Sequence, residues 1–344
     1  MLNDRAPLRD ASVDEKVAFL SSTDAYPERP EAVEAVETHM SWVFLAGPLA
    51  YKLKKPVRYD FLDFSTTEAR RENCEREIRL NRRLAGGVYR RIVPLILRSD
   101  GTLRLGGEGI TTDWLVEMRR LPAHRMLDAA LRAGTVSADD IRRVGRLLNR
   151  FYRRAPRVAV PGARYRKRFE DGIRANHDEL SKPHYGLDAR RIGHLARAQQ
   201  AFIARDGGLL ERRARDGRIV DAHGDLRPEH VCLTPRPVII DCLEFKREFR
   251  LLDPADELAY LAMECDRLGA PAVGDRLLRA HLDAAGDGIP DRLISFYKAF
   301  RAFLRARIAI WHIADHEVRD IERWRARAWD YLRLAEALMQ IKRR

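Results

Sequence analysis

Residues 221–245 read DAHGDLRPEHVCLTPRPVIIDCLEF and carry two aspartates beside short apolar segments. Asp225 follows a His-Gly pair, and Asp241 ends the run Val238-Ile239-Ile240. Short apolar runs on either side of a polar turn predict two strands joined by that turn. The two carboxylates would then lie at strand ends, with His230 on the loop between them. Such a pair can divide a reaction, because one carboxylate accepts a proton while the other holds a cation.

The length and composition set the broad class of protein. The chain has 344 residues, which is enough for two lobes with a sizeable core. No apolar run approaches the ~20 residues of a membrane-spanning helix, and the segment MLNDRAPLRDASVDEKVAFL has no signal-peptide core. The four cysteines form no CxxC pair, so we expect buried, reduced thiols. These features predict a cytoplasmic protein without a membrane segment.

The charge is strongly basic and dominated by arginine. The formal net charge is +13, and nine lysines accompany 55 arginines. A basic balance suits anionic ligands such as nucleotides, phosphorylated metabolites or nucleic acid, and it also suits a solvated arginine-rich surface. Both interpretations stay open at this point. Three of the nine lysines lie in YKLKK at residues 51–55, where a compact point charge stands out among forked guanidinium groups.

The first part of the chain, residues 1–119, predicts a β-rich lobe with one long helix. Residues 41–57, SWVFLAGPLAYKLKKPV, predict a hairpin with its turn at Gly47-Pro48. The S-x-x-E pattern from Ser65 to Glu68 is that of a capping box and predicts a helix that runs to about Leu84 and stops at Gly86-Gly87. Further strands are predicted near residues 91–97, 102–105 and 113–119.

The second part, residues 120–344, predicts a larger and mostly helical lobe. Helical periodicity dominates residues 138–215, with caps at Ser137 and Asp188. Two prolines and a glycine predict a loop over residues 155–168. Residues 218–243 are strand-like, and a further helix is predicted from Asp253-Pro254 to near Gly269. The predicted fold class is therefore α+β.

Several motifs occur in an order that resembles one branch of the protein-kinase-like superfamily. HGDLRPEHVCL followed by VIIDCLEF resembles the catalytic loop and the metal-binding strand end of kinases. With YKLKK, CEREIRLNRRLAGGVY and DPADELAYLAMEC, the chain resembles the aminoglycoside phosphotransferase-like, or choline/fructosamine-kinase-like, branch, and more narrowly an uncharacterised bacterial group within it. The resemblance covers roughly residues 33–270 and implies a two-lobed protein-kinase-like fold. Some relatives carry a C-terminal P-loop domain, but this sequence has no GxxxxGK[ST] motif, so we expect the first module alone.

The resemblance implies a role for each residue of the opening motif. Asp225 would be the catalytic base, Asp241 the metal ligand, and His223 a brace for the loop. From the residues alone, Asp225 could instead be a turn carboxylate that bonds local amides, and Asp241 a strand-end cap.

The lysine strand would hold the nucleotide phosphates. Side chains alternate along a strand, so Lys52 and Lys54 share one face. The resemblance implies that one of them grips the α- and β-phosphates and pairs with a helix glutamate. We favour Lys54, from its spacing before Pro56, with Lys52 second; the partner would be Glu77, with Glu75 as the runner-up. The alternative is a solvated edge strand facing exposed helix acids.

Two further segments are given roles by the same resemblance. Leu115-Val116-Glu117-Met118 resembles the linker between kinase lobes, where the backbone of Glu117 and Met118 would read the adenine edge. Asp253 is expected to cap the helix that begins at Pro254, and Asp256 to help brace the catalytic loop.

The sequence departs from the kinase pattern in two places. The glycine-rich phosphate loop is missing, because the first glycine of the chain is Gly47. VETHMSW would cover the phosphates instead, with the hydroxyls of Thr38 and Ser41. His230 stands where the loop asparagine of kinases would stand. Its imidazole could ligate a metal, for which nitrogen suits Mn²⁺ better than Mg²⁺, or it could brace the loop, and we lean to ligation.

These observations predict an ATP- and Mg²⁺-dependent phosphotransferase, with Mn²⁺ as a second candidate metal, that acts on a hydroxyl of a small molecule. A cationic aminoglycoside acceptor would need acidic walls, so resistance activity is not expected. One helix face carries basic side chains that would favour an anionic acceptor if they line the cleft, or that would simply be solvated: Lys298, Arg301, Arg305 and His312.

Two other classes of function remain open from the sequence. The missing glycines and His230 would suit a pseudokinase that binds nucleotide and regulates a partner. The basic surface would suit a nucleic-acid-binding protein, although we find no recognised nucleic-acid-binding module. The acceptor, the pathway and the oligomeric state are not predicted.

Overall fold

The computed structural model describes residues 11–59, 62–313 and 320–341. The chain divides into two compact units. The first is Met1–Ala123 together with Ile239–Arg247, and the second is His124–Val238 together with Glu248–Arg344. The segment 239–247, which carries Asp241, was placed with the helical lobe on sequence grounds and instead belongs to the first unit.

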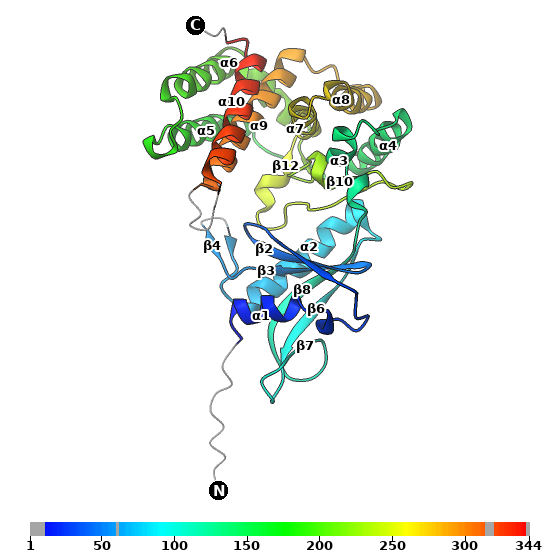
Figure 1. Cartoon of the computed structure of the whole chain (residues 1–344). Coiled ribbons are helices and arrows are strands. Elements are labelled where there is room, and N and C mark those ends of the chain that lie inside the picture. The colour runs from blue at the N-terminus through cyan, green and yellow to red at the C-terminus, as the bar shows by residue number, and fades with distance from the viewer. Residues whose placement is uncertain (1–10, 60–61, 314–319, 342–344) are drawn as a thin grey trace. The chain divides into compact units, whose positions relative to one another are not determined.

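The first unit is built on an antiparallel sheet. Within the described residues this sheet has six strands in the order β1-β2-β3-β8-β6-β7 (Figure 1). The strands are β1 (Val33–Glu37), β2 (Ser41–Ala46), β3 (Leu49–Lys54), β6 (Tyr89–Leu97), β7 (Leu103–Leu105) and β8 (Ile110–Arg119). The other elements are α1 (Val13–Leu20), a 3₁₀ turn (Thr23–Ala25), the short pair β4 (Arg58–Tyr59) and β5 (Leu62–Asp63), and α2 (Thr67–Ala85).

The two faces of this sheet have different coverings. On one face, Tyr51 and Leu53 of β3 join a buried cluster with Leu20 and Tyr26 from the α1 region. Helix α2 packs against β6 and β8 (Figure 1). Side chains alternate along β3, so the lysines of this strand point away from the Leu20–Tyr26 cluster. The sheet therefore separates an apolar layer from the face that carries the ionisable groups.

The predicted hairpin and long helix are confirmed, with one shift. β2 pairs with β3 around the turn at Gly47, whose φ of 56° is left-handed. The N-cap of α2 is Thr66, which accepts from the amide of Ala69, whereas Ser65 donates its hydroxyl to Asp63. The capping box predicted at Ser65 is therefore one residue too early, because Asp63 competes for that hydroxyl.

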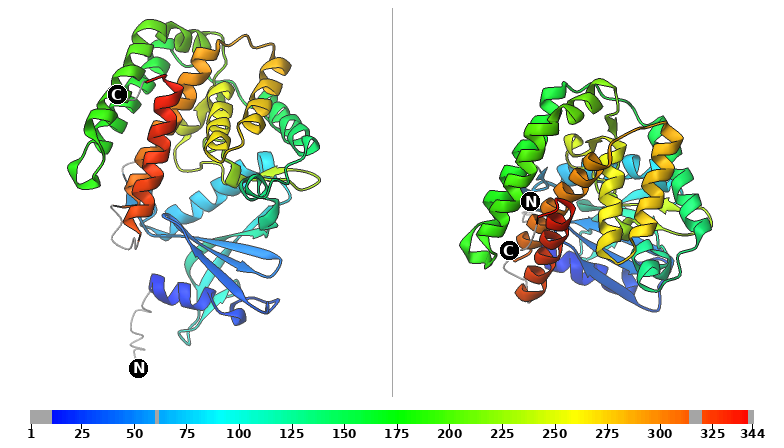
Figure 2. Two further views of the ribbon diagram at one scale, coloured as in Figure 1. Left: turned by 45° about the horizontal axis from the view of Figure 1, so that its top comes forward. Right: turned by 90° about the horizontal axis from the view of Figure 1, so that it is seen from above.

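The second unit is mostly helical. Its helices are α3 (Leu127–Arg132), α4 (Ala138–Arg154), α5 (Gly162–Leu180), α6 (Ala189–Arg215), α7 (Pro254–Arg267), α8 (Pro271–Ala285), α9 (Asp291–Trp311) and α10 (Ile321–Leu338). Where the sequence predicted strands over residues 218–243, the structure has the two-residue strands β9 (Val220–Asp221), β10 (Val231–Cys232) and β11 (Val238–Ile239); β12 (Leu251–Leu252) pairs with β9. Figure 2 shows α9 and α10 side by side, with α5 and α6 forming a second pair.

Caps and aromatic packing explain these helices. Ser137 and Asp188 cap α4 and α6 as predicted. The loop predicted over 155–168 is wrong from Gly162 onward, because α5 begins there. A β-carbon at Gly162 would lie 3.0 Å from the side chain of Glu211, so this glycine marks a close helix contact and not a loop. Phe169, Phe296 and Phe300 then pack between α5 and α9.

Two further features concern the cysteines and the helices. The four cysteines are free and buried. Among the helices of the described residues, none is both long and apolar enough to cross a membrane.

Candidate functional site

The candidate residues fall into two groups, one in each unit. In the first unit, Lys52 and Lys54 project from the same face of β3 and both donate to Glu77 of α2. The distance from Lys52 Nζ to Glu77 Oε1 is 2.9 Å. Glu75, the runner-up in the sequence analysis, is exposed and pairs with Arg71 of its own helix. The expected pairing of the lysine strand with Glu77 is therefore observed.

The segment that returns to the first unit completes an ion-pair chain. Lys52 Nζ also lies 2.9 Å from Asp241 Oδ1, and Lys54 Nζ lies 2.7 Å from Glu244 Oε1. The five side chains Lys52, Lys54, Glu77, Asp241 and Glu244 are called the lysine cluster below. Within it Lys54 has a side-chain exposure of 1%, and Asp241 one of 44%. Lys52 therefore connects the buried network to the accessible carboxylate, whereas Lys54 stays inside.

The backbone around Asp241 is held in an unusual conformation. The amide of Asp241 donates to the Tyr89 hydroxyl at 3.1 Å, and the amide of Cys242 donates to Asn81 Oδ1 at 2.9 Å. The φ of Asp241 is 62°, which is a left-handed value for a residue with a β-carbon. Such strain is stable only where the surroundings impose it, and it is commonest at functional sites.

Electrostatics within the lysine cluster follow from its charges. Burial alone would lower the pKa of Lys52, but Asp241 and Glu77 outweigh it and raise that pKa well above its ordinary value. Burial would raise the pKa of Glu77, but Lys52 and Lys54 hold it below its ordinary value. Burial raises the pKa of Glu244. Three carboxylates share two lysines, and within the cluster Glu244 is buried with one lysine contact, whereas Glu77 has two and Asp241 is accessible to solvent.

The geometry reverses the order of preference between the two lysines. The spacing before Pro56 favours Lys54 for the phosphates, but Lys52 is the lysine that contacts Asp241. Lys54 is enclosed by Glu77 and Glu244. Sequence reasoning missed Glu244, and the signal available was a lone acid three residues after Asp241.

The turn expected to cover the phosphates lies between β1 and β2. The Thr38 hydroxyl donates to the carbonyl of Ser41 at 2.8 Å and accepts from its amide at 3.0 Å. Ser41 is 2% exposed. The Thr38 hydroxyl therefore bonds within its own turn. A phosphate bound at this turn would contact backbone groups more readily than the hydroxyls of Thr38 and Ser41.

The linker assigned to residues 115–118 is wrong. Glu117 and Met118 lie inside β8, which pairs with β3 on one side and β6 on the other. The Glu117 side chain is buried and pairs with Arg91. Backbone groups that belong to two ladders are not available to read an adenine edge. An apolar run followed by charges does not distinguish the end of a strand from a linker, which explains the error.

In the second unit, Asp225 lies in the HGD loop, residues 223–230. Arg227 donates from Nε to Asp225 Oδ2 at 3.0 Å, and the Tyr260 hydroxyl donates to Asp225 Oδ1 at 2.9 Å. The Asp225 side chain keeps 21% exposure. The carboxylate is thus held in one orientation by two donors while part of it stays accessible.

The HGD loop is anchored from α7. The amides of His223 and Gly224 donate to the buried carboxylate of Glu257, and Tyr152 donates to the same group at 2.8 Å. Burial raises the pKa of Glu257, although these donors oppose the effect. His223 is fully buried and accepts from the amide of Asp225 at 3.3 Å, which agrees with a bracing role.

Asp253 and Asp256 contact different groups. Asp253 caps α7 by accepting from the amide of Ala255 and also binds Arg213 with both oxygens. Asp256 forms a two-oxygen ion pair with Arg301 of α9. Glu257, one residue on, holds the HGD loop, so the brace assigned to Asp256 belongs to its neighbour. One position is a rotation of about 100° around a helix, which the sequence pattern did not resolve.

His230 has both ring nitrogens engaged within its own loop. Nδ1 lies 2.7 Å from the carbonyl oxygen of Asp225, and Nε2 lies 3.1 Å from Arg227 Nη2. Arginine can only donate, so Nε2 accepts and Nδ1 carries the proton. These contacts favour a bracing role for His230 over the predicted role as a metal ligand.

The arginines and the lysine of the α9 stripe are mostly buried and paired with acids. Lys298 pairs with Asp266 and Asp275, and Arg305 lies 3.3 Å from Glu264. Arg301 and Lys298 are 4% and 7% exposed. His312 stacks on Trp324 of α10. The helical periodicity was correct, but acids from neighbouring helices meet this face.

Comparisons with solved structures define the class of fold. A choline/ethanolamine kinase family protein from Mesorhizobium loti superposes with a TM-score of 0.56 at 17% identity, covering 95% of each chain. A choline kinase from Cryptosporidium parvum superposes with a TM-score of 0.50 at 10% identity, covering 94% of this chain and 96% of that one. At such identities the comparisons show the fold, and this chain has the two-lobed, protein-kinase-like α+β fold that its sequence predicts.

Sequence relatives are closer but carry no described activity. No protein-family model matches the chain. Uncharacterised proteins of Mycobacterium tuberculosis and Mycobacterium bovis are 35% identical over 292 residues, which cover 83% of this chain. The chain spans 56% of the length of these curated relatives. This likeness agrees with the resemblance to an uncharacterised bacterial group.

Proposed function

We propose that this chain is an ATP-dependent phosphotransferase that moves the γ-phosphate to a hydroxyl of a small molecule. The observation that carries the proposal is the contact chain from Glu77 through Lys52 to Asp241. It joins a helix, a strand and a returning segment that are far apart in sequence. A kinase-like nucleotide site requires this set: a lysine fixed by a helix acid beside an accessible strand-end carboxylate.

The proposed reaction assigns one task to each group. Lys52 contacts the nucleotide phosphates and neutralises part of their charge. Asp225 accepts the proton of the acceptor hydroxyl as its oxygen forms a bond to the γ-phosphorus. The bond between that phosphorus and the bridging oxygen breaks, and ADP leaves with the electron pair. Arg227 and Tyr260 keep the Asp225 carboxylate oriented for this transfer.

The donor set in the first unit fits Mg²⁺. This ion prefers oxygen ligands and is commonly held by one or two carboxylates with phosphates and waters. Asp241 offers an accessible carboxylate, and the lysine cluster has three carboxylates for two lysines. Among the described residues no group of three or more His, Cys, Asp or Glu side chains forms a metal cage of its own. Mg²⁺ would therefore come with the nucleotide, held by Asp241, and would neutralise phosphate charge.

A screen of ATP consumption over metabolite pools tests the proposal. Wild type should consume ATP with at least one hydroxyl-bearing fraction, and Asp225→Ala should not. Isothermal titration should show Mg²⁺-ATP binding that Lys52→Ala weakens and Lys55→Ala does not, because Lys55 bonds Glu37 outside the cluster. Binding without turnover in any pool would favour the regulatory, pseudokinase alternative. Absence of binding would overturn both.

A further inference from the structure

An arginine-rich group surrounds the HGD loop within the second unit. Four arginines from separate elements meet two carboxylates there. This arginine cluster consists of Arg227 of the loop, Arg267 of α7, Arg305 of α9, Arg327 of α10, Glu229 and Glu264. The arginine side chains are 13–27% exposed. The cluster is therefore partly buried but still reachable from solvent.

Glu264 is fully engaged in this cluster. Arg267 donates from Nε to its carboxylate at 2.7 Å, and the Tyr331 hydroxyl donates at 2.8 Å. Burial would raise the pKa of Glu264, but Arg305 and Arg267 hold it below its ordinary value. This half of the cluster is a closed network.

Glu229 is not engaged in the same way. Its carboxylate faces Arg227 Nη1 at 3.9 Å, Arg267 Nη2 at 3.8 Å and Arg327 Nη2 at 3.9 Å. All three distances exceed a hydrogen bond. Among the described residues, Glu229 Oε2, Arg267 Nη2 and Arg327 Nε are buried atoms that make no hydrogen bond. Buried polar groups are normally satisfied, so the unpaired donors Arg267 Nη2 and Arg327 Nε indicate that an acceptor group binds there, whereas Glu229 Oε2 needs a donor such as water or a hydroxyl.

The sign of the excess charge in the arginine cluster indicates the chemical class of the group that binds there. Four guanidinium groups face Glu229, Glu264 and the Asp225 carboxylate that Arg227 binds, which leaves one positive charge in excess. Guanidinium groups bind carboxylate and phosphate oxygens through paired hydrogen bonds. A cationic acceptor would be repelled, whereas an oxyanion would satisfy the donors that Glu229 leaves unpaired.

We propose that the arginine cluster binds an oxyanion, a phosphate or carboxylate group, on the molecule that is phosphorylated, with Arg267 and Arg327 as the recognition residues. This inference rests on the proposed function and names its substrate class. The acceptor hydroxyl would then approach Asp225, which shares Arg227 with the cluster.

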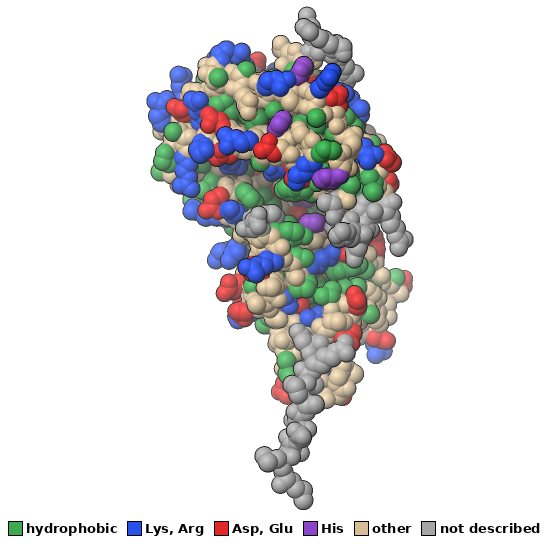
Figure 3. Space-filling model, turned by 90° about the vertical axis from the view of Figure 1, so that its left-hand side faces the viewer, with side chains coloured by type: hydrophobic (Ala, Val, Ile, Leu, Met, Phe, Trp, Pro, Cys, Tyr) green, Lys and Arg blue, Asp and Glu red, His purple; other side chains and the backbone are tan. Residues whose placement is uncertain are grey.

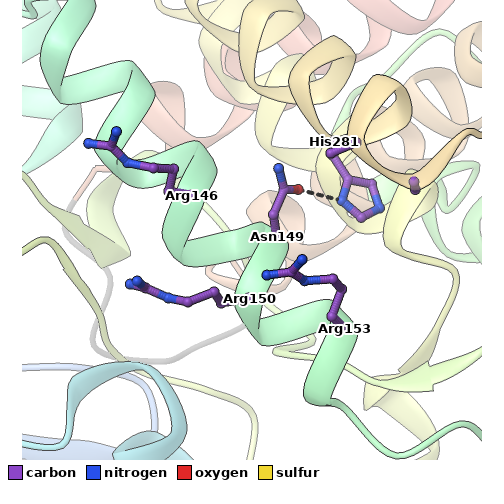
Figure 4. Close-up of a pocket in the computed structure, with 7 residues that line it drawn as sticks. Arg146, Asn149, Arg150, Arg153 and His281 are labelled. Carbon is purple, nitrogen blue, oxygen red and sulfur yellow. Dashed lines mark hydrogen bonds between the residues drawn. The ribbon is translucent and has the colours of Figure 1, made fainter.

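A second arginine-rich hollow serves as a contrast. This hollow lies between α4 and α8 and has a volume of about 360 Å³. Figure 4 shows Arg146, Arg150 and Arg153 around it. His281 Nδ1 lies 2.8 Å from Asn149 Oδ1 beside them. Its arginines are exposed, and both helices present their C-terminal halves, where the helix dipole favours cations over anions. The hollow gives no comparable sign of an anion, and Arg150 is a matched control.

The first arm of the test measures anion binding without turnover. Inorganic phosphate and acetate are titrated separately into the full chain with ADP in excess, so that nucleotide phosphate contacts are already occupied. Wild type should bind at least one of them, which also separates phosphate from carboxylate recognition. Arg327→Ala should weaken binding by about tenfold or more, as expected for a lost charge-assisted hydrogen bond. Arg327→Lys should retain part of the affinity, and Arg150→Ala all of it.

The second arm compares acceptors that differ mainly in charge: glucose, glucose 6-phosphate, gluconate and glucosamine. The anionic members should have the highest kcat/KM and glucosamine the lowest. Arg327→Ala should remove the anionic advantage through KM, with kcat and ATP affinity retained. An absence of anion binding in wild type, equal losses in Arg327→Ala and Arg150→Ala, or a preference for glucosamine would each overturn the inference. Failure of ATP binding would instead overturn the proposed function, whereas anion binding that is lost in Arg327→Ala and kept in Arg150→Ala would still report on the arginine cluster.

Discussion

The lysine cluster and the arginine cluster both combine basic side chains with carboxylates, but they differ in the sign of their excess charge. In the first unit, three carboxylates surround two lysines, and both lysines hydrogen-bond two carboxylates each. In the second unit, guanidinium groups outnumber carboxylates and leave buried atoms without hydrogen bonds. A closed network with surplus negative charge holds a segment in place and suits a cation. An open network with surplus positive charge suits an anion.

The chemistry of the two cations matches this difference. A lysine ammonium is compact and can sit between two carboxylates inside a sheet-and-helix layer, as Lys54 does. A guanidinium is planar and presents several donors, so it can hold one acid and keep a donor for another group. Lys54 thus lies where close packing accepts a compact ammonium and excludes the larger guanidinium.

The largest expected effect separates the roles of Asp225 and Asp241. Asp225→Ala should lower phosphate transfer by at least ~10²-fold while Mg²⁺-ATP affinity stays close to wild type, because a general base acts only in the chemical step. Asp241→Ala should remove Mg²⁺-dependent nucleotide binding itself. Titration calorimetry and steady-state kinetics on both variants check this. Small and equal effects from the two variants would contradict the division of labour.

The second prediction separates the two lysines of β3. Lys54→Ala leaves Glu77 and Glu244 buried with less compensation and should lower the free energy of unfolding by about 3–5 kcal/mol. Lys52→Ala should affect nucleotide affinity more than stability, because its side chain reaches the accessible Asp241. Urea unfolding measures the first effect and calorimetry the second. A reversed pattern would restore Lys54 as the phosphate lysine.

The third prediction uses pH to contrast the clusters. The pKa of Glu264 is depressed in the folded state, so its contribution to stability is present above the unfolded value of ~4.5 and is lost as pH falls through the folded value. The pKa of Glu244 is raised, so its contribution is present below ~4.5 and is lost as pH rises through the folded value. Urea unfolding of Glu264→Gln and Glu244→Gln across a pH series should show slopes altered in opposite directions. Slopes altered in the same direction would refute the contrast.

The smallest expected effect concerns His230. Both ring nitrogens bond within the HGD loop, so His230→Asn should lower the rate modestly and leave the ratio of Mn²⁺ to Mg²⁺ activity unchanged. A shift of that ratio toward Mg²⁺ would show that His230 reaches the metal and would restore the ligand role first considered. Activity measured with each metal at neutral pH is sufficient.

The distribution of charge over the surface bears on the case for an anionic acceptor. On the face drawn in Figure 3, basic side chains are numerous over the helical unit and are interspersed with acidic ones. A mixed surface of this kind explains part of the net charge of +13 without any ligand. The case for an anionic acceptor therefore rests on the unsatisfied atoms around Glu229 and not on the overall charge.

The sequence alone predicted the local elements and the separate motifs whose residues meet in the lysine cluster. The hairpin around Gly47 and the helix that ends at Gly86 follow from turn and capping chemistry, which acts between near neighbours. The pairing of β3 with Glu77 follows from alternation along a strand and from the resemblance to kinases. Asp225 and Asp241 were located the same way, and their chemical roles remain predictions.

Only the tertiary structure determined which side chains from other elements contact a given face of a helix or strand. It placed Asp241 beside Lys52, and it put Glu244 against Lys54. It covered the α9 stripe with acids from other helices, and it gave the HGD loop its anchor in Glu257 instead of Asp256. Periodicity shows which side chains share a face, because that is a property of one element. What meets that face depends on contacts between elements distant in the chain, and no local pattern records them.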